Sequence, residues 1–95
     1  TIALARMTSV PNPTRGSTSI GLDLSRISAG ADIALRVFDV SGRLVRELWN
    51  GTRTAAPTSV DWDGRSTNGT RVAPGKYLAR VDADGEYNGR QVLDV

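Results

Sequence analysis

The chain contains neither cysteine nor histidine among its 95 residues. Without cysteine it can form no disulfide framework and no thiolate metal site. Histidine is the commonest metal ligand in proteins and the residue most often used as a general base, so its absence removes the usual basis of a catalytic or metal-binding site. These absences predict that the protein is not an enzyme, and we expect it to use no cofactor and no metal.

Concentrated charge and long apolar runs are missing as well. The formal net charge is +2, and Lys76 is the only lysine among the basic residues. Arginines and acids are spread evenly along the chain, which is unlike the basic stripe of a nucleic-acid-binding protein. No apolar stretch approaches the roughly 20 residues that a membrane-spanning helix needs. We therefore expect no nucleic-acid partner and no insertion into a membrane.

The length and composition of the chain predict one domain over residues 1–95. Hydrophobic residues make up 39% and charged residues 23% of the chain, as in an ordinary soluble globular domain. The sequence opens with Thr1 rather than methionine, and no signal peptide is recognisable in its first residues. We expect the domain to be a piece of a larger protein.

Short runs of β-branched and aromatic residues, separated by glycine, proline, asparagine and aspartate, predict an all-β sandwich or barrel. Seven strands are expected, at residues 2–10, 18–24, 33–40, 44–49, 58–62, 77–81 and 87–95. Pro11 and Pro13 place the first strand at a sheet edge. Ser41-Gly42, Asn50-Gly51 and Asp84-Gly85 are expected to be turns. Residues 25–31 could form one helical turn or a plain loop.

Alternation of apolar and polar residues indicates which side chains face the core. The spacing of Val45 and Leu48, three residues apart, indicates either a β-bulge or a strand that is apolar on both faces. The expected core consists of Ile20, Leu22, Leu24, Ile33, Leu35, Val37, Val45, Leu48, Val60, Trp62, Tyr77, Ala79, Val81 and Val92.

Four blocks of the sequence, in matching order and spacing, resemble the FlgD-like immunoglobulin domain, a family named after the flagellar hook-capping protein. The blocks are Phe38-Asp39-Val40-Ser41-Gly42-Arg43-Leu44-Val45-Arg46-Glu47-Leu48, Val60-Asp61-Trp62-Asp63-Gly64-Arg65, Asn68-Gly69 and Val72-Ala73-Pro74-Gly75-Lys76-Tyr77. The resemblance covers roughly residues 10–95. It implies a seven-stranded antiparallel immunoglobulin-like β-sandwich of the kind found mostly at the C-terminal ends of exported bacterial proteins.

The resemblance also implies structural roles for single residues. Trp62 would be a core aromatic between the two sheets. Asp63-Gly64 and Asn68-Gly69 would shape a long hairpin loop, and Pro74-Gly75 would set the start of the next strand. Asp39 is expected to accept hydrogen bonds from the backbone of its own turn. None of these roles is chemical.

A second resemblance is to the C-terminal sorting domains of the bacterial type IX secretion route. It depends on Gly75-Lys76-Tyr77 and on Arg90-Gln91-Val92-Leu93, although the sorting domains more usually carry lysine at the place of Arg90. The Trp-Asp-Gly block at Trp62 favours the FlgD-like family. A third alternative, a piece of the hook cap itself, fits less well because its assembly segments are absent.

Candidate sites in the sequence are few. Asp61-x-Asp63-Gly64 and Asp82-x-Asp84-Gly85-Glu86 resemble fragments of a calcium loop, but both lack a third acidic ligand and the closing bidentate glutamate. Neighbouring carboxylates could in principle hydrolyse glycosides, yet so small a sandwich offers little cleft. Lys76 could form an isopeptide bond only if it were buried, and its place beside a turn predicts exposure.

The aromatic residues raise the question of a contact surface. Trp62 and Tyr77 are expected in the core, which leaves Trp49 and Tyr87 as the exposed pair and as a possible contact surface for carbohydrate or protein. The sequence thus predicts a non-catalytic accessory module that spaces, stabilises or docks a larger exported protein, outside the cell or on its surface. Expected partners are neighbouring domains, secretion machinery or cell-surface components. The alternatives are a sorting domain and a carbohydrate-binding module.

Overall fold

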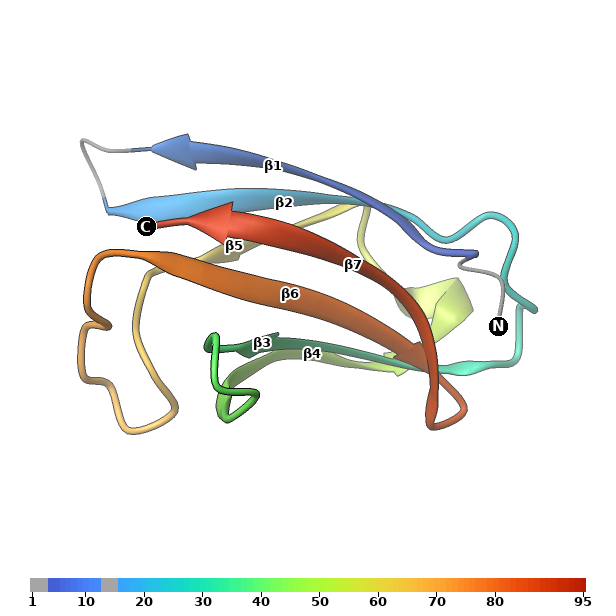
Figure 1. Ribbon diagram of the computed structural model, residues 1–95. Coiled ribbons are helices and arrows are strands. Elements are labelled where there is room, and N and C mark those ends of the chain that lie inside the picture. Colours follow the sequence, from blue (N-terminus) through green and yellow to red (C-terminus); the bar gives the residue numbers. More distant parts are fainter. Residues whose placement is uncertain (1–3, 13–15) are drawn as a thin grey trace.

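The computed structural model describes residues 4–12 and 16–95 and shows two β-sheets that face each other (Figure 1). The elements in chain order are β1 (Arg6–Asn12), β2 (Ser17–Asp23), β3 (Asp32–Phe38), β4 (Leu44–Thr52), the one-turn 3-10 helix η1 (Arg53–Ala55), β5 (Ser59–Trp62), β6 (Lys76–Ala83) and β7 (Glu86–Asp94). Residues 25–31, for which the sequence left two possibilities, form turns without a helix. In the described ranges no helix is long and apolar enough to cross a membrane.

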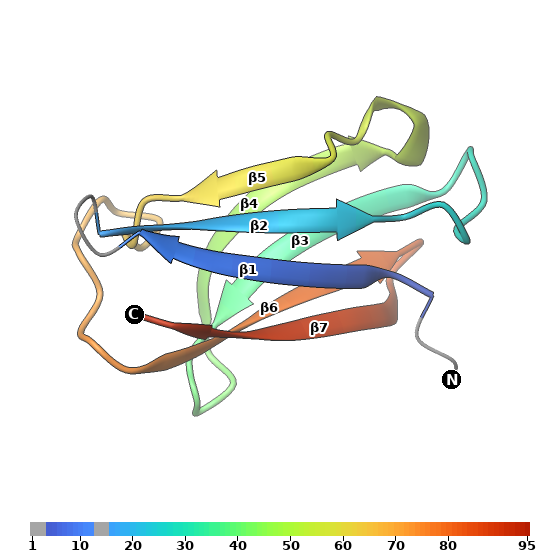
Figure 2. The same cartoon turned by 90° about the horizontal axis from the view of Figure 1, so that it is seen from above.

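All strand pairs are antiparallel. One sheet has three strands in the order β1-β2-β5, and the other has four in the order β4-β3-β6-β7. Figure 2 shows the two sheets stacked, with β1, β2 and β5 over the other four strands. The predicted seven-stranded immunoglobulin-like sandwich is therefore confirmed.

The core lies between the two sheets and consists of the inward-facing residues of both. Its fully buried large side chains are Trp62, Ile20, Ile33, Leu35, Leu93, Val37 and Val81. The predicted core residues Leu22, Val45, Leu48, Val60 and Tyr77 are partly buried and pack against this centre. The prediction for Val92 is wrong: its side chain is 50% exposed, and its neighbour Leu93 is buried instead.

Trp62 occupies the centre of the core, as predicted. Its side chain is fully buried, and its ring packs edge-on against Tyr77 with 5.5 Å between the ring centroids. The indole Nε1 donates a hydrogen bond of 2.9 Å to the backbone carbonyl of Arg65, so the buried polar atom is satisfied. The core ring thereby also fixes the start of the long loop that follows β5.

Strand β4 carries the bulge that the spacing of Val45 and Leu48 suggested. Its pairing with β3 shifts twice, and the extra residues at these two places are Leu48 and Val45. Asn50-Gly51, expected to be a turn, lies inside β4. Gly51 is needed there because a Cβ atom would come within 2.8 Å of the Trp49 ring, which lies against it.

The turns at Ser41-Gly42 and Asp84-Gly85 are confirmed. Asp39 acts as expected: one of its carboxylate oxygens accepts hydrogen bonds from the amides of Ser41 and Arg43 and from the Ser41 hydroxyl. Gly42 has a φ of 88°, the left-handed conformation that favours glycine. The β3–β4 turn is therefore held by its own polar groups.

The first and last strands close one side of the sandwich. The first strand, predicted at residues 2–10, is β1, and it lies at a sheet edge as expected. It continues through Pro11 to Asn12 instead of stopping before the proline, and Pro13 lies outside the described residues. The Ala5 amide donates a hydrogen bond of 2.9 Å to the Asn88 carbonyl in β7. This backbone contact between the two sheets requires Gly89, because a Cβ atom there would lie 2.5 Å from the Ala5 carbonyl oxygen.

Candidate functional site

The two aromatic residues proposed as a contact surface lie on opposite faces of the four-stranded sheet. Trp49 is opposite the buried Leu35, and its partly buried ring packs against the core. Tyr87 is opposite Asp82, whose side chain projects away from the core, and it is 36% exposed. The structure therefore does not bring the two rings together, and they cannot stack on one sugar chain.

The face of the four-stranded sheet that is turned away from the core, here called the outer face, carries side chains in rows across the strands. One row, the charged row, consists of Glu47, Arg36, Arg80 and Arg90, which are opposite one another in β4, β3, β6 and β7. Like charges opposite one another destabilise a sheet unless acids offset them. This row therefore needs carboxylates beside it.

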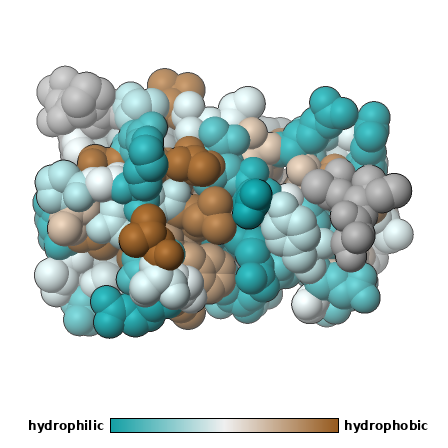
Figure 3. Space-filling model, viewed as in Figure 1, coloured by the Kyte–Doolittle hydropathy of each residue, from teal (hydrophilic) through white to brown (hydrophobic). Residues whose placement is uncertain are grey.

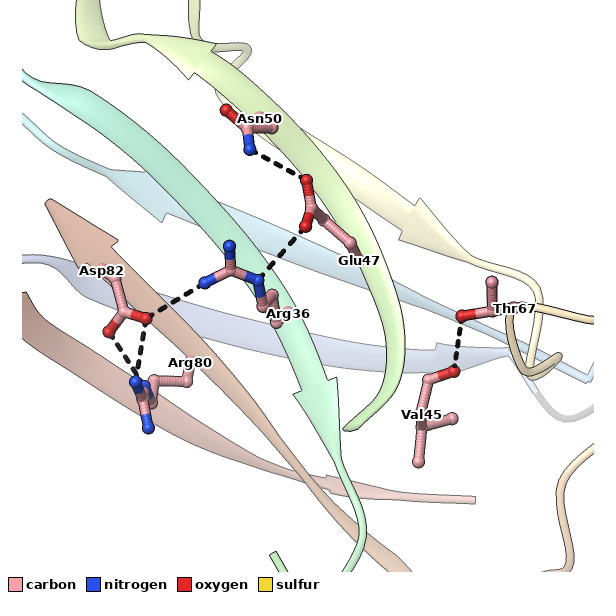
Figure 4. A network of polar contacts seen from close by, with 7 residues as sticks. All are labelled: Arg36, Val45, Glu47, Asn50, Thr67, Arg80 and Asp82. Atoms are coloured by element: carbon pink, nitrogen blue, oxygen red, sulfur yellow. Dashed lines mark hydrogen bonds and ion pairs between the residues drawn. The ribbon is translucent and has the colours of Figure 1, made fainter. Parts of the chain in front are cut away.

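Two acids neutralise part of the charged row (Figure 4). Arg36 lies between them, 3.2 Å from Glu47 on one side and 3.3 Å from Asp82 on the other. Arg80 holds Asp82 with two hydrogen bonds of 2.9 Å. Asp82 is only 5% exposed although it lies on the outer face, because these arginines cover it.

The pKa values of two groups in this network, Glu47 and Arg80, move in the directions that keep them charged. The amide of Asn50 and then the Arg36 guanidinium donate to Glu47 and lower the pKa of its carboxyl. The hydrogen bonds to Asp82 raise the pKa of Arg80. These shifts favour the charged forms of Glu47 and Arg80, as an ion-pair cluster requires.

A second row on the outer face is entirely apolar. Leu44, Phe38, Leu78 and Val92 are opposite one another across the same four strands and form what we call the apolar row. The Arg80 guanidinium lies over the Phe38 ring, 5.3 Å from its centroid, and joins the two rows. In the space-filling view, hydrophobic side chains gather over β6, β7 and the β3–β4 turn (Figure 3).

The apolar row was missed from the sequence. The alternation in β3 does place Phe38 opposite to the core residues Ile33, Leu35 and Val37, which was the available signal. Recognising a continuous row also requires the register of four strands, and the bulges in β4 and β7 shift that register. The sequence alone therefore cannot align Leu44 and Val92 with Phe38.

In each of the two calcium-like fragments, the aspartate before the glycine binds protein groups. Asp63 accepts hydrogen bonds from the Arg46 guanidinium and from the Arg65 amide. Asp84 accepts one from the Asp32 amide and occupies a turn with a φ of 51°. In residues 4–12 and 16–95, no group of three or more acids is arranged to hold a metal ion.

Lys76 lies at the surface of β6, as predicted, and forms an ion pair with Asp94 of β7. Both side chains are about two-thirds exposed. Exposed pairs of this kind contribute little stability.

The sandwich and its turn motifs are those of a known family. The model of the FlgD Ig-like domain matches residues 8–86, and the chain belongs to this family. Its resemblance to the family, first seen in the turn motifs, is therefore confirmed. No match was found among curated protein sequences.

Two solved structures from Porphyromonas gingivalis contain a similar domain. Dimeric latent PorU is 25% identical, with a TM-score of 0.64 over 93% of this chain and 8% of PorU. PorZ, an essential surface component of the type-IX secretion system, is 25% identical, with a TM-score of 0.53 over 92% of this chain and 11% of PorZ. The chain thus spans a small part of each of these proteins.

Proposed function

We propose that the chain is a non-catalytic accessory module that spaces, stabilises or docks other domains of a larger exported bacterial protein, outside the cell or on its surface. The observation that carries the proposal is the relation to PorU, in which a domain like this one makes up 8% of a much longer chain. PorZ repeats this relation and is a surface component. Both favour a part that works attached to other domains.

The chemistry of the domain supports the same role. Asp39, Asp63, Asp82 and Glu47 are engaged in turns and ion pairs. The lowered pKa values of Asp39 and Glu47 favour the charged forms of these two carboxyls. A catalytic acid or base would instead need a pKa moved toward neutrality in a concave site. The described residues supply a core, ordered turns and an exposed sheet face, which is what a structural or docking module requires.

Deletion of residues 1–95 from the longer protein tests this role. The deleted form should keep the turnover number of the remaining domains, since this domain supplies no catalytic group. It should lose resistance to proteolysis or its attachment at the surface. A deleted form that equals the full protein in protease half-life, location and partner binding would refute the proposed function.

A C-terminal sorting domain for type IX-like secretion is the second candidate, because PorZ belongs to that system. The two candidates differ in the fate of the domain after export. The intact mass of the mature protein outside the cell separates them: a chain that still contains residues 1–95 supports a permanent module, whereas a chain that has lost them supports a cleaved sorting signal.

A further inference from the structure

Strand addition at a sheet edge is restricted in this domain. The Thr67 amide and hydroxyl both donate to the Val45 carbonyl at the outer edge of β4, with distances of 3.0 and 3.1 Å. The amide of Ala5, the residue before β1, donates to β7, and Pro11 gives β1 one position without an N–H donor. β5 has only four residues. A partner is therefore expected to bind a face of the sandwich instead of a sheet edge.

The outer face of the four-stranded sheet carries a continuous apolar feature. The apolar row runs from one edge of the sheet to the other, and Leu44 and Val92 are each about half exposed. Three members of this row, Phe38, Leu78 and Val92, line a shallow open groove of about 440 Å³ together with Val40 of the β3–β4 turn. Scattered exposed apolar side chains are normal, but a continuous patch indicates a contact site.

The charged groups beside the groove indicate what kind of partner would fit it. The charged row and Asp82 together contain three arginines and two carboxylates, and both carboxylates are engaged by Arg36 and Arg80. Arg90, exposed on β7 next to Val92 and opposite Arg80, makes no ion pair with any acid in the described part of the chain. The groove is thus bordered by one uncompensated positive charge.

We propose that the apolar row and Arg90 form a docking surface for a protein segment that presents apolar side chains next to a carboxylate. The apolar side chains would occupy the groove over Phe38, Leu78 and Val92, and the carboxylate would pair with Arg90 and relieve its repulsion with Arg80. This inference rests on the proposed docking role and names the surface and the chemistry of its partner.

A second copy of the chain fits this surface less well. A two-fold contact between identical faces would bring the same uncompensated arginine to the interface from both sides. Like charges brought together at an interface oppose association. An acidic and apolar segment removes the excess charge, which a copy of the chain does not.

Titration of the isotope-labelled 95-residue chain with two synthetic peptides, followed by NMR, tests the proposal. The peptides share their leucine and phenylalanine positions, and one carries glutamate where the other carries lysine. The acidic peptide should shift the amide signals around Phe38, Leu78 and Val92, and the basic peptide should bind at least about tenfold more weakly, equivalent to 1.4 kcal/mol. The chain should not bind phosphatidylglycerol vesicles through this face.

Matched variants locate the site. Val92→Ser and Arg90→Glu should each weaken binding of the acidic peptide about fivefold or more, since they remove one apolar contact and the ion pair. The controls are Val10→Ser, an exposed valine on the other sheet, and Arg26→Glu, with the same change of charge in a loop. Neither control should change the affinity. Arg90 is exposed, so its replacement leaves the core intact.

Three results would overturn the proposal: no binding of the acidic peptide at millimolar concentration, equal binding of the basic peptide, or equal losses in the control variants. Preference for phosphatidylglycerol vesicles through the same residues would replace a protein partner with a lipid surface. These measurements use the isolated chain, so they fail or succeed independently of the deletion experiment on the longer protein.

Discussion

At the scale of single residues, polar atoms hold the loops of this sandwich, and Asp39 is the clearest case. Its carboxylate accepts three hydrogen bonds within the β3–β4 turn. Asp39→Ala should lower the urea concentration at the midpoint of unfolding, because the amides of Ser41 and Arg43 lose their acceptor. Asp39→Asn, which keeps an oxygen at the same place, should lose less.

The contribution of Asp39 to the stability of the fold should depend on pH. The Ser41 hydroxyl and then the amides of Arg43 and Ser41 lower the pKa of this carboxyl below its ordinary value of 3.8 in the folded protein. A lowered folded-state pKa stabilises the fold above pH 3.8, and this contribution is lost as the pH falls through the folded-state value. The difference in unfolding midpoint between the wild type and Asp39→Ala should therefore be large at pH 7 and shrink at pH 2. A difference independent of pH would contradict this account.

Trp62 gives a second prediction at this scale. Trp62→Phe keeps an aromatic ring in the core but removes the Nε1–H that satisfies the Arg65 carbonyl. The free energy of unfolding should fall by about 1–3 kcal/mol. Tyr77→Phe is the matched control, because its hydroxyl bonds the Ala73 carbonyl in an exposed place, and it should cost about 1 kcal/mol or less. Urea unfolding of both variants measures their free energies of unfolding. An equal loss in the two variants would contradict the expectation that the buried hydrogen bond stabilises the fold more than the exposed one.

At the scale of the elements, the contact between β1 and β7 depends on one glycine. Gly89→Ala would place a Cβ atom 2.5 Å from the Ala5 carbonyl oxygen, so the backbones must separate. We expect a loss of about 1–3 kcal/mol in the free energy of unfolding. Gly30→Ala, in a loop with no atom within 4 Å of the new Cβ, should be neutral or slightly stabilising. Thermal unfolding of both variants decides the matter, and equal melting temperatures would contradict the proposed close approach.

Strand β7 also contains a position at which the sequence pattern does not identify the core-facing residue. In most strands the alternation alone identifies the core face, as for Ile33, Leu35 and Val37. In β7 the adjacent Val92 and Leu93 are both apolar, and the core-facing positions before them are Gln91 and Gly89. Gln91 faces inward because its amide reaches Ser9 of β1. Such contacts across the two sheets leave no pattern within β7 itself, so the sequence favoured the wrong residue.

Strand β4 shows the opposite case. The spacing of Val45 and Leu48 was enough to indicate a bulge, and both residues are the extra ones in the pairing with β3. Gly51 misled the prediction because a glycine next to asparagine is typical of a turn, whereas here the missing side chain makes room for the Trp49 ring. Residue spacing and a glycine pair can thus show that a strand is irregular, but they do not always show which contact causes the irregularity.

At the scale of the whole molecule, the family could be predicted from the sequence, and the candidate surface could not. Turn motifs are local, so they identified the FlgD Ig-like domain without any tertiary information. The apolar row combines residues from four strands between positions 38 and 92, and only their pairing aligns them.

The isolated chain should be a stable monomer. The radius of gyration of its Cα atoms is 12.7 Å, close to the value of about 13 Å expected for a compact domain of this length. X-ray scattering at increasing concentration should keep this value constant. Tryptophan fluorescence and far-UV circular dichroism should give coincident unfolding curves. A radius that grows with concentration would show that the apolar row joins two copies, contrary to the charge argument.

Lys76 has a practical consequence because it is the only lysine of the sequence. Its exposed ammonium group pairs with Asp94 at the rim of the groove formed by Phe38, Leu78 and Val92. A reagent that acylates side-chain amines therefore has one target in the chain. A chain coupled to a solid support through that amine turns its outer face toward the support and leaves the three-stranded sheet open to solution, so the choice of coupling chemistry decides which half of the molecule a partner can reach.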